Sequence, residues 1–156
     1  MNLNNQVQKL ALAAVLTSLS VVIDVFFKLI VAQQTFGLPF YAIPLILGSI
    51  VLGPFYGGAM ALVGDTIGVF AAGVTYLPFF VFAPLAWGII PGLILYKKYN
   101  LKKLALAVVL SYISATTTNT FAIYFYFGSL AAYTTLALRL SLALFNATVI
   151  FYLVKD

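Results

Sequence analysis

The sequence has 156 residues, of which 64% are hydrophobic and 7% are charged, and its mean hydropathy of +1.13 is far above that of a soluble domain. It contains no His, no Cys and three acidic residues, which excludes imidazole or thiolate metal sites, Cys nucleophiles and His general bases. Its net charge of +5 comes mainly from basic residues between hydrophobic stretches, a pattern typical of membrane topology rather than of nucleic-acid binding.

Six hydrophobic stretches of roughly transmembrane length follow one another along the chain. We expect helices over residues 10–32, 38–55, 57–74, 77–96, 104–127 and 132–154. Polar or turn-forming segments separate most of them, namely residues 33–35, 53–54 and 97–103. The sequence therefore predicts an all-α integral membrane protein, a compact bundle of six transmembrane helices that forms a single membrane domain over residues 1–156.

The first expected helix resembles a signal peptide at its start, but its apolar run continues past Asp24, so we interpret it as a retained span. Ala14 and Ser18 form a small-xxx-small pair, which suits close contact with another helix. Lys28 lies late in the same helix, where it either extends to the outer headgroups or pairs with a partner inside the bundle.

The second and third expected helices contain the run IPLILGSIVLGPFYGGAMALVGDTIGVF. In it, small residues recur at spacings of four, three and four, at Gly57, Ala61, Gly64 and Gly68. That spacing aligns them on one helix face, which predicts a surface for close helix packing. Asp65 lies beside this stripe, and the pattern leaves open whether it has a structural role or contacts a ligand.

Aromatic residues gather near one end of the expected spans, at Phe36, Phe40, Tyr41, Tyr76, Phe79, Phe80, Tyr126 and Tyr133. An aromatic belt at the membrane interface explains many of them, but a pocket for a planar ligand would use the same rings, together with the deeper Trp87. Polar candidates for such a pocket lie in the last two spans, at Thr116, Asn119, Thr120, Arg139 and Asn146.

The positive-inside rule gives the orientation. Six spans would place both termini and the even-numbered loops on one side, together with Lys9, Lys97, Lys98, Lys102, Lys103 and Lys155. We therefore expect cytoplasmic termini, with Lys28 and Arg139 in the extracytoplasmic halves of their helices. An ion at the centre of a span costs about 2.5–3.5 kcal/mol on insertion scales, so Arg139 is expected to have a partner or a cavity.

The run AIPLILGSIVLGPFYGGAMALVGDTIG resembles the second-to-third span signature of the folate-family S components, the substrate-binding subunits of energy-coupling factor (ECF) vitamin transporters. The opening KLALAAVLTSLSVVI, the Asn119-Thr120 pair and the final LRLSLALFNATVIFYLV resemble the same family, so the similarity covers nearly the whole chain.

This resemblance implies a bacterial plasma-membrane subunit that captures a vitamin from outside and works with a transmembrane coupling subunit and two cytoplasmic ATPases. Ala14 and Ser18 match the positions that dock onto the coupling subunit, with Ser18 replacing a usual Ala. The chain has no GxxxxGK[ST] phosphate loop of its own, and we expect no cofactor, metal or nucleic acid. The expected substrate-binding residues are Phe40, Tyr41, Tyr76, Phe79, Trp87, Asn119, Arg139 and Asn146.

The chain departs from the folate subgroup at two places. Residues 78–81 read Pro-Phe-Phe-Val where the subgroup typically has Pro-Gly-Phe-Thr, and the first span has Asp24 and Lys28 near the position of a frequent Arg. These changes imply a more apolar and more crowded pocket. Folate remains a candidate substrate, and a smaller pyridoxine-like or hydroxymethylpyrimidine-like compound is the alternative that these changes favour.

Two other functions are consistent with an apolar chain of this length. A stand-alone proton-coupled carrier would use Asp24 or Asp65 as its titrating group. A small membrane enzyme or assembly factor is the third hypothesis, and the missing His, Cys and paired acids make it the least favoured.

Overall fold

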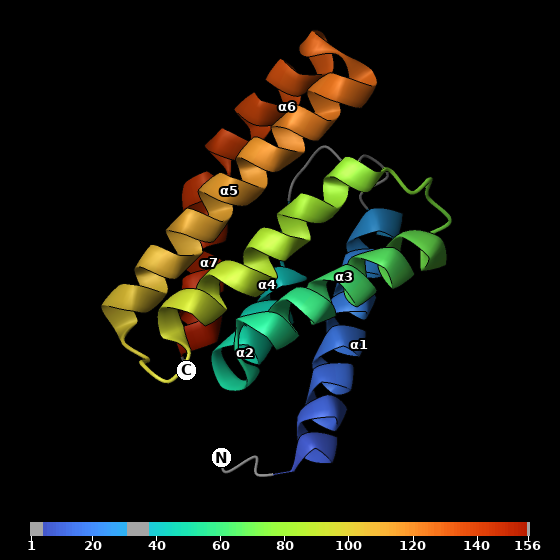
Figure 1. The fold of residues 1–156 in the computed structure, drawn as a ribbon. Coiled ribbons are helices and arrows are strands. Elements are labelled where there is room, and N and C mark those ends of the chain that lie inside the picture. Colours follow the sequence, from blue (N-terminus) through green and yellow to red (C-terminus); the bar gives the residue numbers. More distant parts are fainter. Residues whose placement is uncertain (1–4, 31–37, 156) are drawn as a thin grey trace.

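The computed structural model describes residues 5–30 and 38–155, which contain seven α-helices, one short 3-10 helix and no β-strand. Figure 1 shows how these helices pack. In chain order the elements are α1 (Gln6–Ile30), α2 (Ala42–Leu52), α3 (Pro54–Ala71), η1 (Pro78–Val81), α4 (Phe82–Leu95), α5 (Leu101–Phe127), α6 (Ser129–Ser141) and α7 (Ala143–Lys155). The all-α prediction is confirmed for these residues, whereas residues 33–35 and Phe36 lie outside them.

The prediction of one continuous last helix is wrong, because residues 132–154 are divided between α6 and α7, which meet at a bend of 52°. The carbonyl of Arg139, which would accept the Ala143 N–H in a continuous helix, accepts the Tyr112 hydroxyl at 2.9 Å. Nearby, the Ser141 hydroxyl donates to the Leu138 carbonyl at 2.8 Å, a contact that commonly bends helices. The expected count of six helices therefore becomes seven.

Two other expected helices are shorter than the sequence suggested. α2 spans 11 residues and ends before Gly53, whose φ of 99° is unfavourable for residues other than glycine, and Pro54 then starts α3. The fourth expected helix begins as the 3-10 turn η1. By length and composition, α1, η1 with α4, and α5 can each cross a membrane, and the bent α6–α7 pair would be a fourth span.

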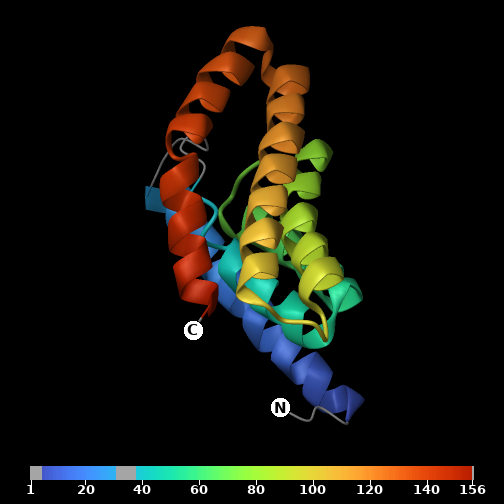
Figure 2. The same cartoon turned by 90° about the vertical axis from the view of Figure 1, so that its left-hand side faces the viewer.

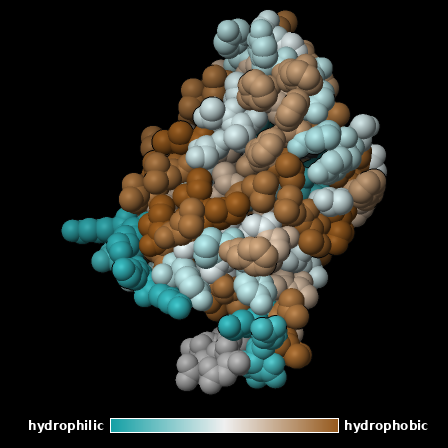
Figure 3. Space-filling view, in the orientation of Figure 1, coloured by the Kyte–Doolittle hydropathy of each residue, from teal (hydrophilic) through white to brown (hydrophobic). Residues whose placement is uncertain are grey.

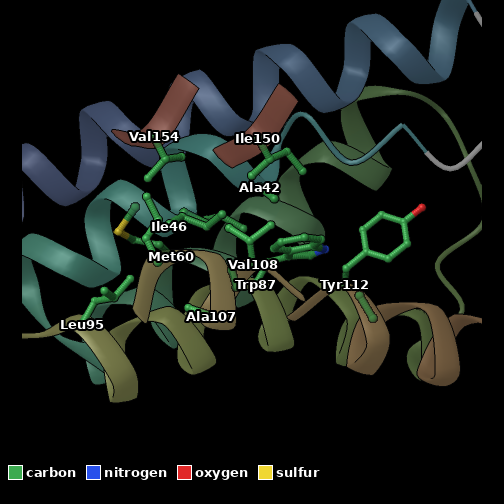
Figure 4. Packing of buried hydrophobic residues seen from close by; sticks show 14 of the residues in the cluster. Ala42, Ile46, Met60, Trp87, Leu95, Ala107, Val108, Tyr112, Ile150 and Val154 are labelled. Carbon is green, nitrogen blue, oxygen red and sulfur yellow. The ribbon is translucent and has the colours of Figure 1, made fainter. Parts of the chain in front are cut away.

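α4 lies at the centre of the bundle, packed against α2, α3 and α5. α1 packs on α2 and α3, α6 on α5, and α7 on both α5 and α2. The buried core includes Trp87 and Leu95 of α4, Ile46 of α2, Val108 of α5 and Ile150 of α7 (Figure 4). Helices that are distant in sequence therefore share one apolar core.

The stripe of small residues on α3 is a packing surface, as predicted. A Cβ added to Gly57 would overlap the carbonyl oxygen of Gly88 in α4, so the two backbones need glycine to approach this closely. Further along α3, Gly64 contacts Thr17 of α1, and Gly68 lies directly under the Asp24 carboxylate. The stripe thus seats α3 against α4 at one end and against α1 at the other.

The two ends of the bundle differ in charge. The start of α1, the α4–α5 connection and the end of α7 lie at the lower end of Figures 1 and 2, and the α5–α6 turn lies at the upper end. Figure 3 shows hydrophilic surface at the lower end below a broad hydrophobic band. The basic residues in these lower segments are Lys9, Lys97, Lys98, Lys102, Lys103 and Lys155.

Candidate functional site

A cavity of about 180 Å³ lies between the helices, in the half of the bundle away from the lysine-rich end. Its walls come from the second half of α1, the segment just before α2, α3, the α3–η1 connection, η1, α4, α5 and α6. Aromatic and apolar side chains cover most of it. The charged residues in its lining are Asp24, Lys28, Asp65 and Arg139.

The aromatic wall is built around Trp87 and Tyr112. Their rings meet edge to face, with centroids 6.1 Å apart and an interplanar angle of 80°. Figure 4 shows the Tyr112 ring beside Trp87, with its hydroxyl pointing away from the apolar core. That hydroxyl donates to the Arg139 carbonyl and accepts a hydrogen bond from Asn146 Nδ2 at 3.3 Å. Tyr112 therefore joins α5, α6 and α7 at the cavity wall.

The two carboxylates of the cavity lie on the α1–α3 side. Asp24 Oδ2 is 2.6 Å from Lys28 Nζ, one helical turn later on α1. Asp65 lies one turn before Gly68 on α3, and Gly68 is the residue over which Asp24 sits. Lys28 is close enough to influence Asp65 electrostatically. Within the described part of the chain, however, Asp65 has no hydrogen bond and no ion pair.

Arg139 forms the opposite, basic side of the cavity. It lies in the last turn of α6 with only 6% of its surface exposed. Among the residues that the structure describes, its Nε has no hydrogen-bond partner and its guanidinium has no ion pair. α6 and α3 do not pack against each other, and Arg139 and Asp65 both line the cavity.

The residues expected to bind substrate divide into two groups. Those in the cavity lining are Tyr41, Tyr76, Trp87, Asn119 and Arg139. The others lie outside the lining: Phe40 packs its ring on Phe27 at 5.4 Å, and Asn146 is fully buried behind Tyr112. Phe79 belongs to a ring cluster with three aromatic residues of α5, namely Phe121, Phe125 and Tyr126.

Tyr112 is the main lining residue that the sequence analysis missed. Thr116 follows Tyr112 by four residues, and Asn119 follows Thr116 by three. These spacings place all three on one face of α5. That periodicity was a usable signal. Asp24 and Asp65 carried a signal as well, since ionisable residues inside a span generally mark a functional interior.

The small-residue pair of α1 lies well away from this cavity. Ala14 and Ser18 are both exposed, and the Ser18 hydroxyl donates to the Ala14 carbonyl at 2.9 Å. They precede Asp24, a lining residue, by ten and six residues, which correspond to about 15 and 9 Å along the helix. A partner bound at the pair would therefore leave the cavity free.

The apolar helices are those of a multi-pass membrane protein, and a cavity lies between them. The family model described as ECF transporter, substrate-specific component, matches residues 8–155. The chain belongs to this family, and it is a substrate-binding subunit that associates with an ECF module. Comparison with curated proteins gave no match, and neither did comparison with solved structures.

Proposed function

We propose that this S component captures a small aromatic vitamin from outside a bacterial cell and delivers it through a transmembrane coupling subunit driven by two cytoplasmic ATPases. The observation that carries the proposal is the cavity that combines the Trp87–Tyr112 wall with Arg139 and Asp65. An apolar pocket with a few convergent polar groups is typical of small-ligand sites. The chain itself captures the substrate, and its partners supply the energy.

The proposed orientation has both termini in the cytoplasm and a single membrane domain. The lysine-rich end would face the cytoplasm under the positive-inside rule, which directs the cavity half outward. Six crossings then require α6 and α7 to act as one bent span and α2 and α3 to form two short ones. Arg139 would then lie in the outer half of the protein, where it lines the cavity.

The size of the cavity bears on the choice of vitamin. Its volume of about 180 Å³ lies below the roughly 300–1,000 Å³ of common ligand pockets. This favours a pyridoxine-like or hydroxymethylpyrimidine-like ring over the larger folate. Tyr41, Tyr76, Trp87, Asn119 and Arg139 would contact the ring directly, whereas Phe40, Phe79 and Asn146 would support these contacts from behind.

We expect a compound with one ring or a small fused ring to co-purify with the protein, because a high-affinity site in a native cell is occupied by its substrate. The measurement is mass spectrometry of the small molecules released when the pure protein is denatured. As a control, Thr116→Trp places a large side chain in the cavity lining and should yield protein without the compound. Recovery of lipid alone, or equal recovery from the control, would contradict the proposed site.

A further inference from the structure

The two charged sides of the cavity are not equally satisfied. On the α1–α3 side, the Asp24 carboxylate already forms an ion pair with Lys28. Its negative charge is therefore balanced without a ligand. Asp65 lies in the same wall with no hydrogen bond or ion pair within the described residues. Lys28 is thus paired with Asp24, and Asp65 is available to bind a ligand.

Arg139, on the α6 side of the cavity, is a buried cation whose side chain is also unpaired in the described structure. Its buried Nε has no partner in the described part of the structure, and the Tyr112 hydroxyl bonds to the backbone carbonyl of Arg139 rather than to its side chain. A buried polar or charged group without a partner is costly. A ligand that satisfies both Arg139 and Asp65 would therefore recover free energy at two separate points.

The charges of the lining balance, since Asp24 and Asp65 oppose Lys28 and Arg139. A dianionic ligand would satisfy Arg139 but bring negative charge toward Asp65. A ligand with separate donor and acceptor ends avoids this repulsion. α3 and α6 do not pack against each other, so a ligand that contacts both Asp65 and Arg139 would extend between the two helices.

On this basis, and resting on the proposed function, we propose that the substrate is a dipolar ring compound that presents an amine or N–H donor to Asp65 and a hydrogen-bond acceptor to Arg139. Asp65 is then a specificity-determining residue, which selects amino-substituted rings over hydroxyl-substituted ones. The ring itself lies between these ends, against Trp87 and Tyr41, whose side chains line the space between the two walls.

Two matched pairs of compounds test this assignment. The first is pyridoxamine and pyridoxine, which differ only in an aminomethyl or hydroxymethyl group on the same ring. The second is a hydroxymethyl-substituted aminopyrimidine and the same ring with a second hydroxymethyl group in place of the amine, since a hydroxyl group directly on the ring would tautomerise to an N–H donor. Binding of each compound to the purified wild-type protein is measured by quenching of Trp87, the only Trp, and by the shift in unfolding temperature.

In the pair that binds, the amino compound should bind about tenfold or more tightly than its hydroxyl partner. The ammonium group of pyridoxamine, or a protonated aminopyrimidine, brings positive charge to the Asp65 carboxylate, whereas a hydroxyl group donates only a neutral O–H. Asp65→Asn keeps the shape of the side chain and removes its negative charge. It should weaken binding of the amino compound alone, so that the amino compound binds less than about threefold more tightly than its hydroxyl partner. Thr66→Val is the matched control, since within the described residues the Thr66 hydroxyl bonds only to the Leu62 carbonyl of its own helix. That variant should keep the full preference.

The outcomes separate this inference from the proposed function. Equal binding of both members of a pair, tighter binding of the hydroxyl compound, or a preference that survives in Asp65→Asn would overturn the inference and leave vitamin capture standing. Failure of all four compounds to bind the wild-type protein would contradict both the proposed ligand class and the inference. If Asp65→Asn does not yield folded protein, the preference of the wild-type protein decides.

Discussion

A protein carrying Ala14→Trp together with Ser18→Trp is expected to bind its ligand normally and to lose uptake down to the background of cells without the chain. Both side chains are exposed on α1, and close approach of a partner helix depends on small residues there. Two indole rings would hold that helix several Å away. The measurement combines ligand binding by the purified subunit with uptake in cells that supply the coupling subunit and the ATPases.

The control for this pair uses the neighbouring stripe of the same helix. Val15 and Leu19 have the same spacing and are 65% and 49% exposed. Val15→Trp with Leu19→Trp should leave both binding and uptake close to wild type, because large side chains already occupy that stripe. Normal uptake by the Ala14–Ser18 variant would show that this face is not the docking surface. Loss of binding in that variant would contradict the proposed separation of docking from capture.

Arg139→Gln is expected to weaken ligand binding by about tenfold or more, since a charge-assisted hydrogen bond to the ligand acceptor is lost. The unfolding temperature of the ligand-free protein should stay equal or rise, because the guanidinium is buried without an ion pair in the described structure. Opposite effects on binding and stability distinguish a ligand contact from a packing residue. Titration and thermal unfolding of the same preparations measure both.

Two further variants make this result specific to the guanidinium group. Arg139→Lys keeps the charge but loses the forked geometry, so its affinity should lie between those of wild type and Arg139→Gln. Thr134→Val lies on the exposed side of α6 and should bind like wild type. If Arg139→Gln binds ligand with wild-type affinity, Arg139 does not recognise the substrate. A large fall in stability of the ligand-free variant would instead assign Arg139 to the fold.

The helices were largely predictable from the sequence because membrane solvation imposes a local pattern. Every expected apolar stretch contains a helix in the described residues, since a backbone in lipid must satisfy its own hydrogen bonds. The break between α6 and α7 was not predictable in this way. It involves the Tyr112 hydroxyl taking over the Arg139 carbonyl, a contact between residues 27 positions apart that no local pattern encodes.

The site was predictable in its residue types more than in its arrangement. Arg139 and Asn119 stood out as polar residues in apolar helices, and both line the cavity. The i,i+4 spacing of Asp24 and Lys28 already allowed their ion pair. That ion pair, together with the packing of Asp24 over Gly68, decides which of the two acids remains available to a ligand. Such facts come from the packing of α1 on α3, which the sequence does not show directly.

We propose that this chain captures a substrate but depends on partner subunits to move it across the membrane. The most direct test is accumulation of the co-purified compound in sealed vesicles, with the chain alone or with the coupling subunit and both ATPases. We expect ATP-dependent accumulation only in the complete assembly, and none by the lone chain under a pH gradient. Accumulation by the lone chain that follows the pH gradient and is lost in Asp24→Asn or Asp65→Asn would contradict the account and establish a proton-coupled carrier.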